Sequence, residues 1–226
     1  KAVKIIAVAR HTDSIEAIED TIFPFAADIS KPEEIDRLFV YARQIYGDTD
    51  IFIANAGFTY IEKLANPNWE HIENIFRTNV FSPIYALEKL AVESDKPKAF
   101  VVTISGAGLI PLPAYSLYCS TKAALHQFVE TYRYEKKDLL QITCVYPVAT
   151  RTRFFDKATG KRNTPLPFLQ QEAKTVAKKI IKGVEKEKKK VFPSRLFKLF
   201  YPIGRAFPFL LKIYSSNEKR KIKSRL

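Results

Sequence analysis

Residues 99–108, AFVVTISGAG, contain a run of apolar, mostly β-branched side chains that gives way to Ser105 and two glycines. A continuous apolar run of this length predicts a strand buried on both faces, as in a parallel sheet. Comparable runs occur at 4–9 (KIIAVA), 21–28 (TIFPFAAD), 50–57 (DIFIANAG) and 140–147 (LQITCVYP). We therefore expect a parallel sheet in which small and polar residues follow the strands.

Helical periodicity separates these runs. Apolar residues from Ile35 to Tyr46 recur at helical spacing, Gly47 ends the helix, and Ser30 and Glu33 have the spacing of a capping box at its start. Further helices are expected from Asn66-Pro67 to Val80, over 118–135 and over 172–186. Alternating strands and helices predict an α/β fold: a Rossmann-like, doubly wound parallel sheet in three α/β/α layers.

Composition limits the class of protein. The chain has 226 residues, of which 46% are hydrophobic and 27% charged, so it is long enough to bury a sizeable core. Its two cysteines, Cys119 and Cys144, form no disulfide framework, and its three histidines are scattered without metal-ligand spacing. We expect a cytoplasmic protein without a metal site.

The positive charge is concentrated at the C-terminus. Residues 178–226 contain 16 Lys and Arg against 3 Asp and Glu, which accounts for the whole net charge of +13. We therefore divide the chain into a nucleotide-binding catalytic domain, 1–190, and a basic helical tail, 191–226.

Ligands of a parallel sheet bind beyond the carboxyl ends of its strands. After the five apolar runs come Arg10, Asp28, Asn55-Ala56-Gly57, Ser105 to Gly108, and Pro147 to Thr150. Each would be an ordinary connection alone, but together on one rim they predict a crevice large enough for a nucleotide.

The stretch YCSTK places Tyr118 and Lys122 four residues apart, on one face of the expected helix. A lysine ammonium beside a phenol favours the phenolate and lowers the pKa of the phenol, which suits a general acid or base. The alternative is a solvated helix pair without chemistry.

ANAG after a strand, Asn79 in the next helix, Ser105 thirteen residues before Tyr118, and Tyr-x-x-x-Lys together resemble the short-chain dehydrogenase/reductase family over residues 4–185. The resemblance implies catalytic roles for Asn79, Ser105, Tyr118 and Lys122. Tyr118 would be the proton donor and Lys122 its partner on the cofactor ribose. Ser105 would hold the substrate oxygen, and Asn79 would keep a water on Lys122.

The resemblance also implies a cofactor site. Asn55, Ala56 and Gly57 would lie along the adenosine, Asp28 would bind the adenine, and a segment containing Pro147, Val148, Thr150 and Thr152 would pass the nicotinamide amide. Val148 stands where the family usually has Gly. Arg10 follows the strand that would meet the ribose, and no acid comes before Asp13, which favours NADP over NAD.

The front of the chain departs from the family, which begins with a strand and a Gly-rich loop of the form TGxxxGxG. No glycine precedes Gly47, and residues 4–10 resemble the second family strand. We expect that strand and loop to belong to the protein outside these 226 residues. The alternative is a molecule without its main phosphate site: a non-catalytic Rossmann-fold protein that acts at a membrane surface through its tail.

The tail combines aromatic and aliphatic residues with Lys198, Arg205, Lys212 and Lys219 at seven-residue intervals. This spacing predicts one cationic helical face, suited to a helix that lies in a membrane interface. Two prolines and the charges make a membrane-spanning helix unfavourable. A helix pair that covers the substrate pocket or a dimer face is the alternative, and no nucleic-acid-reading motif accompanies the charges.

These features predict an NADP-dependent oxidoreductase that interconverts a ketone or aldehyde and an alcohol. Phe154, Phe155, Phe168 and the aromatic tail indicate a small hydrophobic substrate. Members of the family often form homodimers or homotetramers, so a symmetric oligomer is expected.

Overall fold

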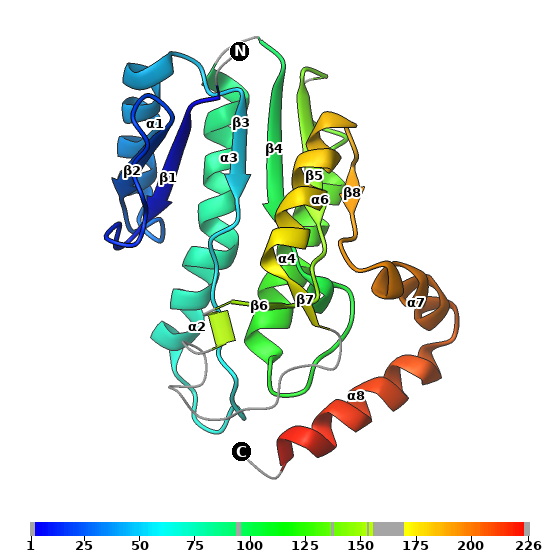
Figure 1. Cartoon of the computed structure of the whole chain (residues 1–226). Coiled ribbons are helices and arrows are strands. Elements are labelled where there is room, and N and C mark those ends of the chain that lie inside the picture. The colour runs from blue at the N-terminus through cyan, green and yellow to red at the C-terminus, as the bar shows by residue number, and fades with distance from the viewer. Residues whose placement is uncertain (1–2, 94–95, 137, 153, 156–169, 224–226) are drawn as a thin grey trace.

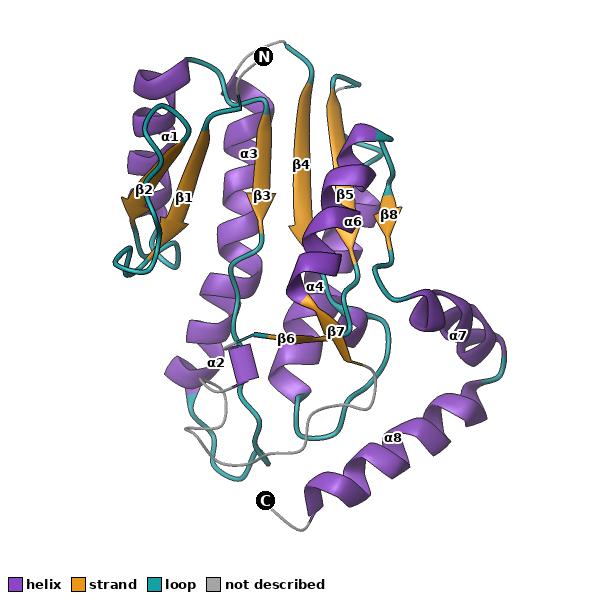
Figure 2. Cartoon of the chain, in the orientation of Figure 1, coloured by secondary structure: helices purple, strands orange, loops and turns teal. Residues whose placement is uncertain are grey.

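A computed structural model describes residues 3–93, 96–136, 138–152, 154–155 and 170–223 (Figure 1). Phe168, which was counted among the hydrophobic substrate-side residues, lies outside them. Most of the described strands run side by side with their carboxyl ends toward one edge (Figure 2). The fold is α/β, as predicted.

The main strands pair in parallel, but they form two ladders. In the first, β1 (Ile5–Ala9) pairs with β2 (Ile22–Ala26). The second has the order β3 (Ile51–Ala54), β4 (Lys98–Thr103), β5 (Leu140–Val145) and β8 (Lys190–Val191). Within the described residues β1 and β3 share no ladder, and Ile5, Ile51 and Ile53 are 46–51% exposed beside this break. The single continuous sheet of the prediction is thus divided here.

Helices cover both faces. One face packs against α1 (Pro32–Tyr46), α3 (Ser82–Glu93) and α4 (Ser116–Tyr132), and the other against α6 (Ala173–Glu185). Two shorter elements, α2 (Trp69–Phe76) and a π-helix, η1 (Arg77–Phe81), lead into α3. The tail forms α7 (Arg195–Ala206) and α8 (Pro208–Lys223), which lie toward the carboxyl ends of the strands (Figure 1).

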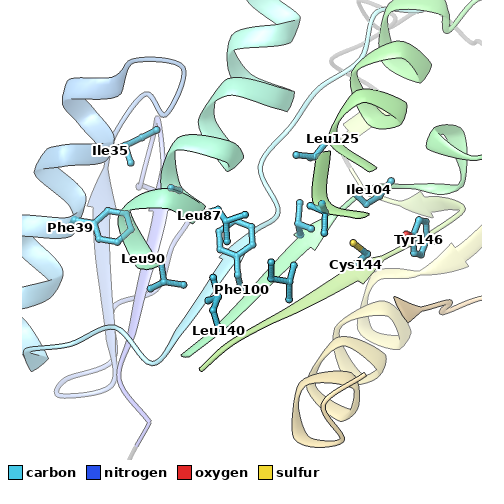
Figure 3. Packing of buried hydrophobic residues seen from close by; sticks show 14 of the residues in the cluster. Ile35, Phe39, Leu87, Leu90, Phe100, Ile104, Leu125, Leu140, Cys144 and Tyr146 are labelled. Carbon is cyan, nitrogen blue, oxygen red and sulfur yellow. The ribbon is translucent and has the colours of Figure 1, made fainter. Parts of the chain in front are cut away.

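The main core lies between the sheets and the first helical layer (Figure 3). Phe52 of β3 stacks between Phe39 of α1 and Phe100 of β4, with 5.6 Å between ring centroids on each side. Phe52 also packs against the cluster around Phe25 of β2. Aromatic packing therefore joins the two ladders where backbone pairing does not.

The expected capping box at the start of α1 is wrong. The N-cap is Lys31, which makes no side-chain capping bond. The hydroxyl of Ser30 instead donates to the carboxylate of Asp28 at 2.8 Å. Pro32 starts the helix, where its missing N–H has no cost.

The tail continues the fold from residue 190. Val191 belongs to β8, so the division at 190 falls within a strand, and Phe197 of α7 is 1% exposed in the main core. α7 ends at Phe207, whose ψ of 81° breaks the helix before Pro208. The expected single helical face of Lys198, Arg205, Lys212 and Lys219 is therefore wrong, since two residues lie on each helix. No helix among the described residues combines the length and apolarity needed to cross a bilayer.

Truncation of Phe197 tests whether the tail is part of the folding unit. Phe197→Ala should lower the free energy of unfolding by about 3–5 kcal/mol, because it leaves a cavity where a buried ring packed. Leu199→Ala on the same helix is the matched control, since Leu199 is 68% exposed and its loss should cost little. Urea unfolding measures both, and equal effects would show that α7 is not docked as described.

Candidate active site

A cavity of about 520 Å³ lies at the carboxyl ends of β3, β4 and β5. Nine residues expected at the site line it: Asn55, Gly57, Ser105, Tyr118, Lys122, Pro147, Val148, Thr150 and Thr152. They come from strand exits, from α4, and from a segment in which β6 (Ala149–Arg151) pairs with β7 (Gln170–Glu172). The exits of β3, β4 and β5 thus share one cavity, whereas those of β1 and β2 lie outside it.

Tyr118 and Lys122 project from successive turns of α4 and are 9% and 4% exposed. The ammonium of Lys122 lies 5.8 Å from the centroid of the Tyr118 ring. Its Nζ donates to the carbonyl of Thr103, at the end of β4, at 2.9 Å. The pair is therefore buried against the sheet, and the interpretation as a solvated helix pair is wrong.

Burial sets the charge states of both groups. It raises the pKa of Tyr118 to about 12, and a side-chain hydrogen bond with Ser105 acts weakly in the opposite direction. It lowers the pKa of Lys122 to about 8, since a buried ammonium loses its hydration. The expected lowering of the Tyr118 pKa by Lys122 is therefore wrong: burial raises this pKa, and the phenol is held protonated.

Ser105 adopts an unusual backbone conformation beside this pair. Its φ of 89° and ψ of 152° lie in a region that is nearly restricted to glycine. Its hydroxyl donates to the carbonyl of Pro147 at 3.4 Å and accepts from the N–H of Ala107 at 3.2 Å. Strain held by surrounding contacts is typical of functional sites, and here it directs a hydroxyl into the cavity.

Asn79 lies behind the cavity wall and is fully buried in η1. Its amide donates to the carbonyl of Phe58 at 2.9 Å and to the hydroxyl of Thr121 at 3.1 Å, and its oxygen accepts the N–H of Phe58 at 3.1 Å. A Cβ on Gly57 would lie 3.0 Å from the Asn79 oxygen and 3.5 Å from the Lys122 ammonium. Asn79 and Lys122 thus flank Gly57, without a direct hydrogen bond between them.

Arg10, Asp28 and Ala56 do not line the cavity. Arg10 and Asp28 follow β1 and β2 and are close enough to interact. Burial acts to raise the pKa of Asp28, but hydrogen bonds from Ser30 and the charges of Arg10 and Lys31 outweigh it, so the pKa is lowered. The two residues form a separate polar group at the ends of the first ladder, and Ala56 is exposed.

Three aromatic cavity residues were missing from the sequence-based site: Tyr115, Phe197 and Tyr214. The ring of Phe197 comes within 3.0 Å of where a Cβ on Gly106 would be, so only glycine lets this tail residue reach the loop after Ser105. Tyr214 projects inward from α8. Neither tail residue belongs to a local sequence motif. The one sequence-based indication was the alternative hypothesis that the tail forms a helix pair over the substrate pocket.

The side chains fit the nicotinamide-ribose end of a dinucleotide. The Lys122 ammonium has three N–H donors, and the described residues provide one acceptor, Thr103, so the other donors are available to ribose hydroxyls. Gly57 leaves the approach to this ammonium open. Arg10 and Asp28 supply a cation and a carboxylate after β1 and β2, outside the cavity. The described residues contain no Gly-rich phosphate loop.

The lowered pKa of Lys122 has a consequence for stability. Between about pH 8 and the ordinary value of 10.5, the unfolded chain holds this proton and the folded chain does not. The free energy of unfolding should therefore rise with pH in this window, by about 2 kcal/mol between pH 8 and 10. Lys122→Met should lack this rise. Urea unfolding at several pH values compares the two proteins, and parallel curves would contradict the assignment.

Known proteins resemble the chain in sequence and in fold. The profile of the family described as short chain dehydrogenase matches residues 3–163. The NADPH-dependent 1-acyldihydroxyacetone phosphate reductase of Saccharomyces cerevisiae is 34% identical over 127 residues, which cover 55% of this chain and 43% of the yeast protein. The 11-beta-hydroxysteroid dehydrogenase-like 3 of Arabidopsis thaliana is 28% identical over 202 residues, covering 81% of this chain and 63% of the relative. The chain thus spans less than two thirds of both relatives.

Two solved structures show the same fold. A short-chain dehydrogenase from Streptomyces avermitilis has a TM-score of 0.76 at 21% identity, covering 98% of this chain and 88% of the other. One from Burkholderia cenocepacia, in complex with NADP, has a TM-score of 0.77 at 18% identity, covering 94% and 86%. The family profile covers more than half of the sequence, and its match includes Asn79, Ser105, Tyr118 and Lys122. The chain belongs to the short-chain dehydrogenase family.

Proposed function

We propose that the protein is an NADP-dependent oxidoreductase that reduces a hydrophobic ketone or aldehyde to an alcohol, or catalyses the reverse reaction. The observation that carries this proposal is the arrangement on one cavity wall. The Tyr118 phenol and the Ser105 hydroxyl line the same cavity, close enough for Ser105 to act on the pKa of the phenol, and the Lys122 ammonium lies 5.8 Å from the centroid of the Tyr118 ring. A proton donor, a hydroxyl that can hold an oxygen, and a cation are the groups that carbonyl reduction needs from the protein.

The proposed chemistry divides the work between protein and cofactor. The nicotinamide supplies the hydride when it is bound, and this hydride adds to the carbonyl carbon. Tyr118 gives its proton to the carbonyl oxygen, and the phenol is loaded for this task because burial raises its pKa to about 12. Ser105 donates a hydrogen bond to the same oxygen. Asn79 is a positioning residue, since it fixes the loop at Phe58 against α4.

The preference for NADP rests on Arg10. The exposed guanidinium at the end of β1 is a suitable partner for a ribose phosphate, and the carboxylate of Asp28 beside it would bind the adenine. The yeast relative is named as NADPH-dependent, and one of the similar structures holds NADP. A similar structure from Burkholderia phymatum holds NAD, so the cofactor needs a direct test.

The substrate class follows from the apolar part of the cavity. Its wall includes Ile110, Leu112, Phe154, Phe155, Phe197 and Tyr214. A wall of this kind binds a ligand by burying apolar surface, while the few polar groups fix its orientation. We infer a lipid-like carbonyl compound, in keeping with the acylated and steroid compounds in the names of the two relatives. We also expect a homodimer or homotetramer.

Removal of the phenol hydroxyl tests the chemistry. Tyr118→Phe should lower kcat for carbonyl reduction by about 10²- to 10⁴-fold, the usual contribution of general acid catalysis, while NADPH still binds. Tyr115→Phe removes another buried hydroxyl from the same wall and should cost much less. Activity is followed by NADPH absorbance and binding by calorimetry. Reduction by Tyr118→Phe at the wild-type rate, or a wild-type protein that does not bind NADPH, would refute the proposal.

Loss of the cation at β1 tests the cofactor preference. Arg10→Ala should raise KM for NADPH by about tenfold and leave KM for NADH nearly unchanged, because only the phosphate loses a charge-assisted hydrogen bond. Arg43→Ala removes an exposed cation on α1 as a control. If KM rose by the same factor for NADPH and for NADH, Arg10 would instead contact a part of the cofactor that the two share.

A further inference from the structure

The outward face of the tail exposes a group of large apolar side chains. Leu196, Leu199 and Ile203 of α7, Phe207 at the break, and Phe209 and Ile213 of α8 are each between 45% and 68% exposed. We call this surface the tail face. On most protein surfaces, exposed apolar side chains are scattered singly. Their concentration on two adjacent helices is therefore typical of an interaction surface.

The two helices separate an inward from an outward side. On α7, Leu196, Leu199 and Ile203 follow i, i+3, i+7 spacing, whereas Phe197 and Gly204 are buried inward. On α8, Phe209 and Ile213 are exposed one turn apart, whereas Tyr214 lines the cavity and Ser215 bonds to the carbonyl of Pro111 at 2.9 Å. The tail face is therefore not the side that holds the tail on the domain.

The charges around this face are of one sign. Six exposed cations lie on the same two helices: Arg195, Lys198, Arg205, Lys212, Lys219 and Arg220. After residue 190 the sequence has one acid, Glu218. It is 5% exposed, belongs to the inward side and pairs with Lys221 at 2.6 Å. Within the described part of the tail, no acid on this face offsets the cations.

We propose that the tail face docks on an anionic lipid bilayer, with α7 and α8 lying in the interface. Leu, Ile and Phe would enter the acyl boundary, and the flanking lysines and arginines would reach the lipid phosphates. Docking does not depend on the proposed reaction. The purpose of docking, however, rests on the proposed function. In the docked protein α8 would lie between the bilayer and the cavity, so a lipid-like carbonyl compound would pass from one to the other beside Tyr214.

Charge complementarity decides between a bilayer and a second copy of the chain. A two-fold interface would bring each tail face against its own copy and place like charges together, without acids to offset them. An anionic surface matches the cations and accepts the apolar side chains at the same time.

Vesicle sedimentation with the whole protein tests the docking. It should bind phosphatidylcholine vesicles that contain phosphatidylserine, bind pure phosphatidylcholine far less, and dissociate as salt rises. Lys212→Glu with Lys219→Glu should weaken the partition coefficient at least about twentyfold, since each lysine contributes roughly fivefold. Phe209→Ser with Ile213→Ser should also weaken it. Both pairs are exposed, so folding is retained, and circular dichroism confirms this.

Controls and outcomes separate the alternatives. Lys186→Glu with Lys188→Glu makes the same charge change near the start of β8, at the other end of the sheet from α7, and should change binding little (Figure 1). Equal binding to both vesicle types, no binding to either, or an unchanged partition in the Lys212/Lys219 variant would overturn the proposal. So would a tail-face variant that loses a dimer in light scattering without any loss of vesicle binding. NADPH titration of the wild type, done in parallel, judges the proposed reaction separately.

Discussion

The fully buried amide of Asn79 is the contact on which the site depends. A buried polar side chain is tolerated only when its hydrogen bonds are made, and Asn79 makes them to the loop after β3 and to α4 at once. Those two elements carry Gly57 and Lys122. Because Asn79 fixes the distance between them, it also fixes where the ammonium lies against Thr103 and beside Tyr118. The π-helical turn that holds Asn79 has the irregular geometry that helices often show at functional sites.

Burial determines the pKa values of the two titratable groups at the site. Tyr118 and Lys122 each lose hydration on the inner face of α4, and their pKa values move apart, to about 12 and about 8. The fold thus keeps the phenol protonated and brings the ammonium closer to neutrality before any ligand is present. A polar cofactor edge would restore part of the lost solvation of Lys122, so burial prepares this group to be completed by a ligand.

The sequence predicted the features that local chemistry determines. Apolar runs identified the parallel strands, their exits placed Ser105, Asn55 and Gly57 at one rim, and helical spacing put Tyr118 beside Lys122. The sequence-based predictions failed where contacts between different parts of the fold override local preferences. Ser30 bonds to Asp28 and leaves the helix terminus uncapped, Phe207 splits the tail helix, and Phe197 and Tyr214 reach the cavity from far along the chain. Long-range contacts of this kind leave no spacing to recognise in one sequence.

The contact between Phe197 and Gly106 joins the loop of Ser105 to a residue more than ninety positions later. During synthesis, Ser105, Tyr118 and Lys122 all leave the ribosome well before Phe197 and Tyr214 do. The nascent chain therefore carries its reactive side chains in a cavity that is open on one side until α7 and α8 close that side. Enclosure of the pocket has to wait for the synthesis of these two helices, so a chain that stops before them would carry the chemical groups without the wall that encloses them.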